Sequence, residues 1–318
     1  MRPRKYFNMI KILLYFGLLF GFAFSTKSQQ EPLLQAAYEK LNTRNFEGAI
    51  MDFNQLISIK PNNVDALCGR AEAKINLGNF AEALKDAELA ISYNANSSKA
   101  LTLKGEALFN LKDYSNAQKY YDQALQKENP PAMATVGRAK VANQLGNPKD
   151  AYKILDDAIE RQPKNPEFYY ARGILNTTKE KYSKALQDYE KAESLDSHFN
   201  PFGISLNLGI AYLNTEETDK AVENLNKAIE LDPKSATAYH TRGLAEYALE
   251  DYKEAVDDFL KSLDLSPANN LNTMFNLGMA YYKLNDKENA CLYFHKSFQA
   301  GNTNACRMIV LVCSDMKR

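Results

Sequence analysis

The sequence YHTRGLAEYALEDYKEAVDDFLKSLDLSP, from Tyr239 to Pro267, decides the fold because its order of residue types occurs elsewhere in the chain. The segment DALCGRAEAKINLGNFAEALKDAELAI, from Asp65 to Ile91, shows the same order: an arginine, a small residue, a turn, an aromatic residue, an alanine and an aspartate. Self-similarity at a fixed spacing is the signature of a repeat architecture. The chain is therefore expected to consist of one structural unit repeated along the sequence.

Eight repeats of 34 residues account for most of the chain. They cover residues 30–63, 64–97, 98–131, 132–165, 166–199, 202–235, 236–269 and 271–304. A small residue stands at position 8 of every repeat: Ala37, Ala71, Gly105, Ala139, Gly173, Gly209, Gly243 and Gly278. An alanine stands at position 20 of every repeat: Ala49, Ala83, Ala117, Ala151, Ala185, Ala221, Ala255 and Ala290. These small side chains predict two helices per repeat that cross with their backbones close together.

Each repeat is predicted to contain two helices of about a dozen residues, separated by a break near position 15. Larger side chains at position 24 fill the space around the helix crossing: Phe53, Tyr121, Leu155, Tyr189, Leu225, Phe259 and Phe294, with Ala87 the small exception. Proline at position 32 ends the second helix in four repeats, at Pro61, Pro163, Pro233 and Pro267, because proline cannot continue a helix. The sequence predicts an all-α fold.

This array resembles the tetratricopeptide repeat family, whose signature is 34 residues with small residues at positions 8 and 20. The resemblance covers Gln30 to Asn304. It implies a right-handed superhelical solenoid of helix-turn-helix repeats, whose concave face, lined mainly by the first helices, binds an extended peptide or a partner helix. The tryptophan that the family carries at position 4 is absent, and Leu33, Leu67, Leu101, Tyr169, Tyr239 or Met274 stands there.

Recurrent charges at positions 7 and 23 are interpreted as salt bridges between the two helices of one repeat, and not as catalytic groups. The pairs, sixteen residues apart, are Arg70/Asp86, Arg172/Asp188 and Arg242/Asp258. Pairing with the aspartate of the preceding repeat would match only Asp52 with Arg70, so pairing within the repeat is expected. Such a partly buried bridge fixes the register of the helices more than it adds stability.

The first 25 residues have the character of a secretory signal peptide. Arg2, Arg4, Lys5 and Lys11 precede thirteen uncharged apolar residues from Ile12 to Phe24. A basic start, a short apolar segment and a small-residue exit are typical of a signal peptide, while a membrane span needs about twenty residues. Cleavage is expected after Ser25, or alternatively after Ser28. The sequence predicts export to the periplasm or envelope of a Gram-negative bacterium, with an uncleaved anchor in the inner membrane as the alternative.

The cysteines near the C-terminus predict a disulfide bond. Residues 305–318 are interpreted as a helix that caps the last repeat, since a solenoid must cover the apolar side of its final unit. Two antiparallel helices would bring Cys291, at the start of one, level with Cys313, at the end of the other. A Cys291–Cys313 bond is therefore expected, with Cys306 as the competing partner of Cys291.

Motifs that carry chemistry are absent from the sequence. Lysine plus arginine and aspartate plus glutamate balance at 39 each, so no basic surface points to nucleic acid. The three histidines, His198, His240 and His295, show no metal-ligand spacing, and no phosphate-binding loop or nucleophile motif occurs. We expect no enzymatic activity, no cofactor and no metal site.

The family resemblance implies that positions 2, 5, 9, 12 and 13 line the binding groove. In the last three repeats these positions are unusually apolar: Leu206, Ile210, Leu213, His240, Leu244, Phe275, Met279 and Tyr282. Apolar and aromatic anchors of this kind suit an inserted peptide or helix. The alternative is that the superhelix closes on itself, or that the register is shifted by one residue and places these side chains in the core. The third and fourth repeats offer a mixed polar surface instead: Lys99, Thr102, Glu106, Met133, Val136 and Lys140.

Asparagine recurs at position 13, in Asn42, Asn76, Asn110 and Asn214. These side chains either bind a peptide backbone along the groove or mark the end of a helix. Position 5 holds no lysine in any repeat, which argues against the clamp with which some tetratricopeptide domains grip a chaperone's terminal carboxylate.

The function expected from the sequence is that of a non-enzymatic protein-interaction scaffold in the cell envelope. Its partner would be a protein or peptide bound in the groove, and a plausible role is to hold together components of an envelope machine. The alternative is an envelope chaperone that shields unfolded clients in the same apolar groove.

Overall fold

A computed structural model describes residues 30–266 and 270–314. The predicted signal segment, residues 1–25 or 1–28, lies outside this range, as do residues 315–318 of the expected capping helix. The described residues contain helices, turns and loops and no strand. The prediction of an all-α fold is confirmed. None of the helices in the described ranges is long and apolar enough to cross a membrane.

The chain divides into two compact units, the first ending at Ile154 and the second beginning at Leu155. We call them the N-terminal and the C-terminal unit. The N-terminal unit opens with a helix over residues 30–42. It continues with α2 (Phe46–Ile59), α3 (Val64–Asn76), α4 (Phe80–Tyr93), α5 (Ser98–Asn110), α6 (Tyr114–Leu125), α7 (Ala132–Gln144) and the start of α8 (Pro148–Arg161).

The C-terminal unit holds the end of α8 and the remaining helices. These are α9 (Pro166–Thr178), α10 (Tyr182–Leu195), α11 (Pro201–Asn214), α12 (Thr218–Leu231), α13 (Ala236–Ala248), α14 (Tyr252–Leu265), α15 (Leu271–Lys283), α16 (Lys287–Gln299) and α17 (Asn304–Cys313). Each repeat thus contains a first helix and a second helix, and α17 follows the last repeat.

The helices begin and end where local chemistry dictates. The side chains of Asn63, Ser97 and Ser235 each accept a hydrogen bond from a backbone N–H in the first turn of the following helix, at 3.2 Å, as capping residues do. At position 15 of all eight repeats the backbone turns with a positive φ. The residues are Arg44, Gly78, Lys112, Gly146, Glu180, Glu216, Glu250 and Asn285. This left-handed residue ends the first helix and lets the second fold back against it.

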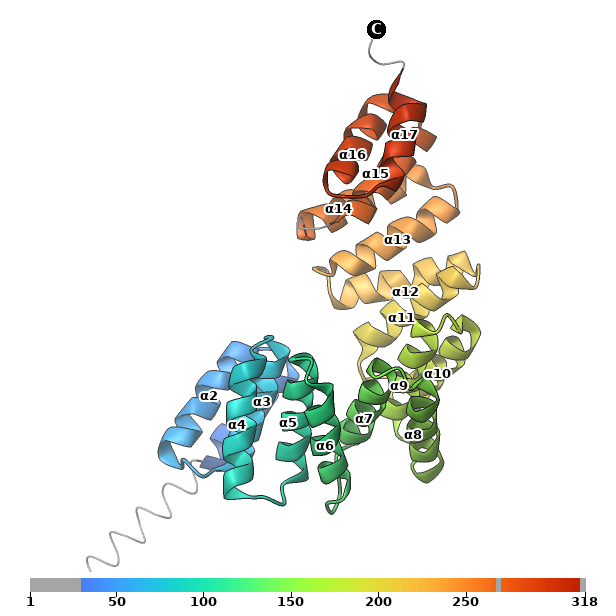
Figure 1. The fold of residues 1–318 in the computed structure, drawn as a ribbon. Helices are drawn as coiled ribbons and strands as arrows, with labels where there is room; N and C mark the ends of the chain where they lie inside the picture. Colours follow the sequence, from blue (N-terminus) through green and yellow to red (C-terminus); the bar gives the residue numbers. More distant parts are fainter. Residues whose placement is uncertain (1–29, 267–269, 315–318) are drawn as a thin grey trace, which may run out of the picture. The chain divides into compact units, whose positions relative to one another are not determined.

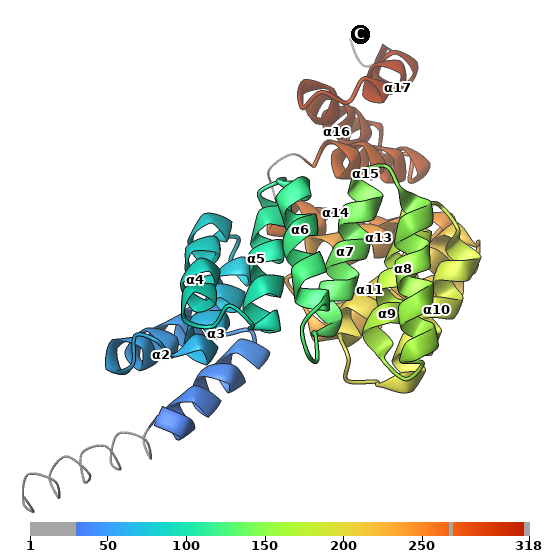
Figure 2. The same ribbon diagram turned by 60° about the horizontal axis from the view of Figure 1, so that its bottom comes forward.

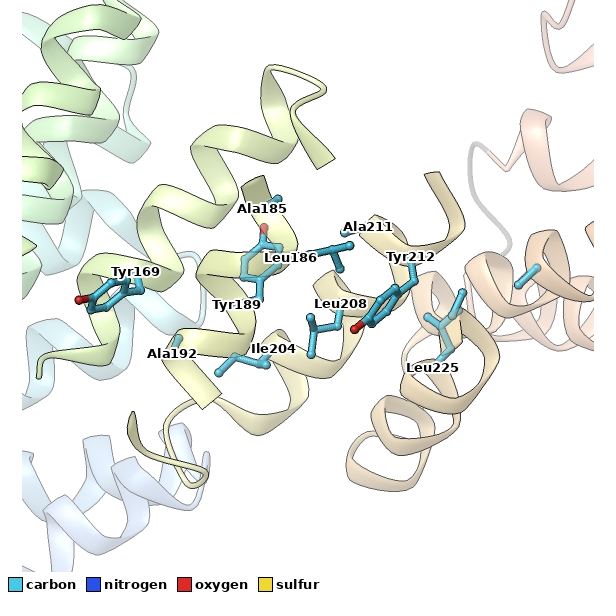
Figure 3. Packing of buried hydrophobic residues seen from close by; sticks show 12 residues of the cluster. Tyr169, Ala185, Leu186, Tyr189, Ala192, Ile204, Leu208, Ala211, Tyr212 and Leu225 are labelled. Carbon is cyan, nitrogen blue, oxygen red and sulfur yellow. The ribbon is translucent and has the colours of Figure 1, made fainter. Parts of the chain in front are cut away.

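The helix crossings are as tight as the small residues predict. All eight alanines at position 20 are completely buried, and the ring or branched side chain at position 24 fills the space beside them. A Cβ atom built on Gly173 would lie 2.5 Å from the ring of Tyr189, so a larger residue cannot occupy position 8 of that repeat without displacing the ring. Figure 3 shows Tyr189 and Leu225 among the apolar side chains that form the core between α9 and α12.

Within each unit the helices stack in sequence order. From α2 to α7 and from α9 to α17, each helix packs against the next one in the sequence. Figure 1 shows this succession from α13 to α16, with α17 beside α16, and Figure 2 shows the pairing of α5 with α6 and of α9 with α10 from another side. The described helices therefore form the helical-repeat solenoid that the period predicts.

Candidate functional site

The predicted arginine–aspartate pairs come together within each repeat. Arg70 donates to Asp86 from Nε at 2.9 Å and from Nη2 at 2.6 Å. The corresponding bonds of Arg242 to Asp258 are both 2.7 Å long, and Nη2 of Arg172 lies 2.7 Å from Asp188. The three aspartates are buried and the arginines half-buried. Each guanidinium therefore ties the first helix of a repeat to the second by a bidentate bond.

The same arginines also reach the preceding repeat, which sequence reasoning missed. Nη1 of Arg172 lies 2.6 Å from Asp156, and Nη1 of Arg242 donates to Asn226 at 2.6 Å. Both partners stand at position 25 of the repeat before, as does Asn54, which accepts from Arg70 at 2.7 Å. The remaining basic residues at position 7 follow the rule, with Lys104 bonded to Glu88 and Arg138 to Asp122, both at 2.9 Å.

A sequence signal for this second partner does exist. A polar or acidic residue stands at position 25 of a repeat whenever the next repeat carries Arg or Lys at position 7. The basic residue at position 7 thus joins three helices, two of its own repeat and the second helix of the repeat before. The charges are structural and link one repeat to the next.

Repeat seven departs from this pattern at position 11. The second repeat carries Lys74 there, 2.7 Å from Asp86, whereas the seventh carries Glu246, beside Asp258 and 3.7 Å from Arg242 Nε. One arginine therefore faces two buried carboxylates. Oε2 of Glu246 is buried without a hydrogen-bond partner. Burial, followed by the charge of Asp258, raises the pKa of Glu246 to about 8.

His240 is placed for packing. Its Nδ1 lies 2.9 Å from the Thr273 hydroxyl, and its ring centroid lies 5.7 Å from that of Phe259. Burial lowers the pKa of the imidazole below its ordinary value. Over residues 30–266 and 270–314 no group of three or more His, Cys, Asp or Glu side chains is arranged to hold a metal ion.

The eight predicted groove residues all lie in the C-terminal unit, and none of them is fully buried. Seven are half-buried and Tyr282 is 40% exposed. Most of the half-buried side chains touch the core with one side: Leu206 and Leu213 pack on the cluster between α9 and α12, Leu244 packs on the cluster around Phe259, and Phe275 and Met279 pack on the cluster around Phe294. These residues therefore form a surface that the core holds in place.

Position 9 supplies an apolar residue in four consecutive first helices. Ile174, Ile210, Leu244 and Met279 occupy it on α9, α11, α13 and α15. Ile174, which is 37% exposed, was missed at the sequence level because only the last three repeats were considered. Position 12 adds a second row, Leu213, Tyr247 and Tyr282. We call these seven residues the apolar face.

Position 5 lies deeper than the resemblance implies. It faces the neighbouring first helix, as the bond from His240 on α13 to Thr273 on α15 shows. In the N-terminal unit Thr102 is 1% exposed, so the expectation that it lines a polar surface is wrong. Its hydroxyl donates to the Ser98 carbonyl in its own helix at 2.7 Å. Leu206, His240 and Phe275 stay partly exposed because their longer side chains extend beyond this contact.

The first helices of the N-terminal unit present charges in place of the apolar face. Position 9 holds Tyr38, Glu72, Glu106 and Lys140 there. Lys99 lies 3.0 Å from Glu72, and Lys140 lies 3.8 Å from Glu106. Met133 and Val136 are half-buried beside them. The polar surface expected in this region is thus neutralised largely by bonds within the protein.

The recurrent asparagines at position 13 end their own helices. The side-chain amides of Asn76, Asn110 and Asn214 donate to the carbonyl four residues earlier, at 2.8–2.9 Å. Their donors are therefore engaged inside the helix, which favours the helix-end interpretation over a backbone-binding role.

The last helix is joined covalently to the repeat before it. Cys291 on α16 and Cys313 on α17 form a disulfide with Cα atoms 5.7 Å apart. Cys306 remains an exposed free thiol and Cys68 a buried one. The outer side of α17 is apolar, since Val310 and Leu311 are 65% and 64% exposed.

Comparisons with known proteins agree with this architecture. Family models of the tetratricopeptide repeat match residues 68–134, 108–175, 166–199, 206–270 and 272–297. The peptidyl-prolyl cis-trans isomerase FKBP4 of Bos taurus is 39% identical over 85 residues, which cover 26% of this chain and 17% of that protein. The photosystem I assembly protein Ycf3 of Prochlorococcus marinus is 31% identical over 87 residues, which cover 27% of this chain and 50% of Ycf3.

Similarity to solved structures extends over nearly the whole chain. The APC/C hetero-tetramer Cut9-Hcn1 matches with a TM-score of 0.71 at 17% identity, over 87% of this chain and 54% of that chain. This likeness shows the fold. The chain spans only 17% to 24% of the length of the FKBP4 relatives that it matches. The family models, taken together, match well over half of the sequence, and the chain belongs to the tetratricopeptide repeat family.

Proposed function

We propose that this protein is a non-enzymatic interaction scaffold that binds a segment of a partner protein on its apolar face. The single observation that carries the proposal is the row of apolar side chains at position 9 of four consecutive first helices, where the N-terminal unit carries polar side chains. A contiguous apolar surface held by the core is the usual mark of a protein-binding site. No cofactor, metal or nucleic acid enters this proposal.

The similar proteins support a role in assembly. Ycf3 is named for the assembly of a photosystem, and Cut9 lies in a hetero-tetramer of the APC/C. Cut9 carries the same fold as this chain over the matched residues, and Ycf3 is similar to it in sequence. A repeat array of this kind acts as a scaffold because its extended surface is sufficient to bind a partner protein.

We further propose that the scaffold works in the periplasm or envelope of a Gram-negative bacterium. The basic and apolar segment at residues 1–25 supports export. The bond between Cys291 and Cys313 supports an oxidising compartment. Attachment to the inner membrane by an uncleaved N-terminal segment is the alternative arrangement.

The experiment is affinity purification of the full chain from its own cells. A variant that places charge on the apolar face, Ile174→Glu/Tyr282→Glu, is compared with a control of equal chemistry, Leu231→Glu/Leu292→Glu. The control residues lie on second helices and are 51% and 46% exposed. We expect one stoichiometric partner with the wild type and the control, and its loss with the first variant.

Two outcomes would contradict the scaffold. A partner retained by Ile174→Glu/Tyr282→Glu would show that the apolar face is not the binding site. Suppression of the aggregation of several unrelated unfolded proteins, without one stoichiometric partner, would favour the envelope chaperone. The same wild-type protein and variants serve both measurements.

A further inference from the structure

The structure also indicates what kind of segment the apolar face receives, and this inference rests on the proposed function. We propose that the partner segment is an amphipathic α-helix whose apolar stripe meets the apolar face and whose basic side chains meet the turns after α11 and α13. The argument combines the spacing of the apolar rows with the charge of those turns.

The spacing of the rows fits one side of a helix. Consecutive first helices of the C-terminal unit contact one another directly, α9 with α11, α11 with α13 and α13 with α15. Helices in contact lie about 8–10 Å apart, so the side chains at position 9 recur at about that distance. Residues seven apart on an α-helix recur on one side at about 10.5 Å. A helix of about three heptads would therefore meet Ile174, Ile210, Leu244 and Met279 in turn.

One edge of the apolar face is acidic. The turn after α11 carries Glu216 and Glu217, and the turn after α13 carries Glu250 and Asp251; all four are exposed. Of these four, only Glu217 has an ion pair within the described residues, with Lys220 at 2.7 Å. Within the described residues, Glu216, Glu250 and Asp251 therefore form no ion pair at this edge.

The acidic edge and the apolar face meet at an aromatic pair. Tyr247 of the apolar face and Tyr252, which follows Asp251, have ring centroids 5.2 Å apart. A cation of the next repeat, Lys283, lies over the Tyr252 ring at 5.7 Å. A helix lying on Tyr247 would thus bring its flanking residues beside Glu250 and Asp251.

The turn conformation alone does not account for these acids. Position 15 has a positive φ in every repeat, a conformation that Gly adopts most easily and Asn more easily than other residues. The N-terminal unit places Arg44, Gly78, Lys112 and Gly146 there, and none of these is acidic. An acidic residue at position 15 is therefore specific to the C-terminal unit, where the apolar face lies, and the one acid at position 16 of the N-terminal unit, Asp113, stands beside Lys112.

The charge is concentrated at the two middle repeats of the unit. The turn after α9 carries Lys179 and Lys181 beside Glu180, and the turn after α15, which holds Asp286, is flanked by Lys283 at the end of α15 and Lys287 at the start of α16. The partner helix is therefore expected to carry its basic residues in its central part. Such charges add orientation and specificity to an apolar contact.

The test uses synthetic peptides and the full chain. Three peptides of equal length, three heptads each, are compared. The first has leucine at the a and d positions and lysines at the flanking positions of its central part. The second replaces the lysines by glutamates, and the third keeps the lysines but replaces the leucines by serines. Binding is followed by fluorescence anisotropy at low and high salt. We expect saturable binding of the first peptide, roughly tenfold weaker binding of the second at low salt, and no binding of the third.

Two matched variants locate the effect. Glu216→Gln/Glu217→Gln/Glu250→Gln/Asp251→Asn removes the acidic edge and is expected to weaken the lysine peptide by roughly tenfold at low salt. Glu160→Gln/Glu193→Gln/Glu230→Gln/Asp257→Asn changes the net charge equally at exposed sites on second helices and is expected to leave the affinity unchanged. Thermal melts check that both variants fold.

The outcomes separate this inference from the proposed function. Equal binding of the lysine and glutamate peptides, with both lost in Ile174→Glu/Tyr282→Glu, would overturn the basic partner and leave the apolar face as the binding site. Equal weakening by both charge variants would also overturn it. Binding that Ile174→Glu/Tyr282→Glu does not affect would overturn the apolar face itself.

Discussion

Arg70 donates two hydrogen bonds to Asp86, from Nε at 2.9 Å and from Nη2 at 2.6 Å, and this pair joins the two helices of the second repeat. Asp86 has a further cation, since Lys74 Nζ lies 2.7 Å from Oδ2, the oxygen that also accepts from Arg70 Nε. Arg70 has a further acceptor in Asn54 of the preceding repeat. The bridge is thus the centre of a small network. Removing Asp86 leaves the cations Arg70 and Lys74 without this anion, whereas removing Arg70 leaves Asp86 paired with Lys74.

We expect Asp86→Asn to destabilise the protein more than Arg70→Met. Asp86→Asn leaves two largely buried cations without their anion and should lower the free energy of unfolding by about 3 kcal/mol. Arg70→Met leaves Asp86 paired with Lys74 and should cost about half as much. Urea titrations of both single variants and the double variant measure the coupling. Costs that add to within about 0.5 kcal/mol would show that the two residues are not energetically coupled.

We expect Gly173→Ala to destabilise the protein although alanine is the better helix former. Alanine would gain about 1 kcal/mol in helix propensity, but its Cβ would lie 2.5 Å from the Tyr189 ring. Displacing that ring should cost about 1–3 kcal/mol. The second repeat combines an alanine at position 8 with a small residue at position 24, Ala71 and Ala87, both buried.

Gly173→Ala should therefore cost less in a Tyr189→Ala background, which removes the ring, than in the wild type. Denaturant midpoints of the four chains in this cycle give the comparison. An equal cost in both backgrounds would contradict the steric explanation, and the resulting loss would then belong to the backbone of α9.

Glu246 is expected to make stability fall as pH rises. Burial and the charge of Asp258 raise its pKa from 4.5 to about 8 in the folded protein. Between these values the folded state holds a proton that the unfolded chain has released. The free energy of unfolding therefore decreases as pH rises from about 5 to about 8. The groups that face Glu246 are Arg242, Asp258 and Glu254.

Glu246→Gln should remove this dependence because the amide does not titrate. Its melting temperature is expected to be close to that of the wild type near pH 5 and higher near pH 8. Glu246→Lys, which restores the cation that Lys74 supplies in the second repeat, should stabilise at both pH values. Parallel melting curves of wild type and Glu246→Gln across this range would show that Glu246 is not protonated in the folded protein.

The disulfide is expected to hold α17 against the last repeat. The bond closes a sequence separation of 22 residues, and a loop of this size corresponds to about 3 kcal/mol in the chain-entropy model. Cys313→Ser should therefore make α17 sensitive to limited proteolysis, while Cys306→Ser, at the exposed thiol, should not. Mass spectrometry of the non-reduced protein checks the bond directly, and intact thiols at both Cys291 and Cys313 would refute it.

The repeat period predicts the helices well because it reflects contacts within one repeat. Gly173 and Ala185 are small since they lie where two helices of the same repeat cross, and this requirement recurs every 34 residues. The partnership of Arg172 with Asp188 was predictable for the same reason. The second partner of Arg172, Asp156, lies in the preceding repeat. That contact becomes visible in the sequence only when position 25 of one repeat is compared with position 7 of the next.

The surface was harder to predict because exposure depends on side-chain size as well as position. Thr102 and His240 share position 5, yet Thr102 is buried and His240 reaches the surface. Ile174 belongs to the apolar face because it stands at position 9 of the fifth repeat. The family resemblance indicates position 9 as part of the groove, but the sequence prediction named apolar groove residues only in the last three repeats. The acidic turns become meaningful only once the apolar face beside them is known.

The rule for position 7 has one further consequence at the last junction. The eighth repeat carries Leu277 at position 7, and the seventh carries Leu260 at position 25, so α14 and α15 meet there without the charged link found at five other junctions. The junction of the fifth and sixth repeats also lacks that link, with Leu208 at position 7, but there the Tyr212 hydroxyl donates to Glu190 at 2.7 Å. In a solenoid each junction holds only its neighbours together, and the array would open first where the junction is weakest. Opening at this point would carry α15, α16 and α17 away as one disulfide-bonded piece. Met279 and Tyr282 would then be separated from Leu244 and Tyr247, which divides the apolar face. The protein would release a bound partner while most of its helices stay folded.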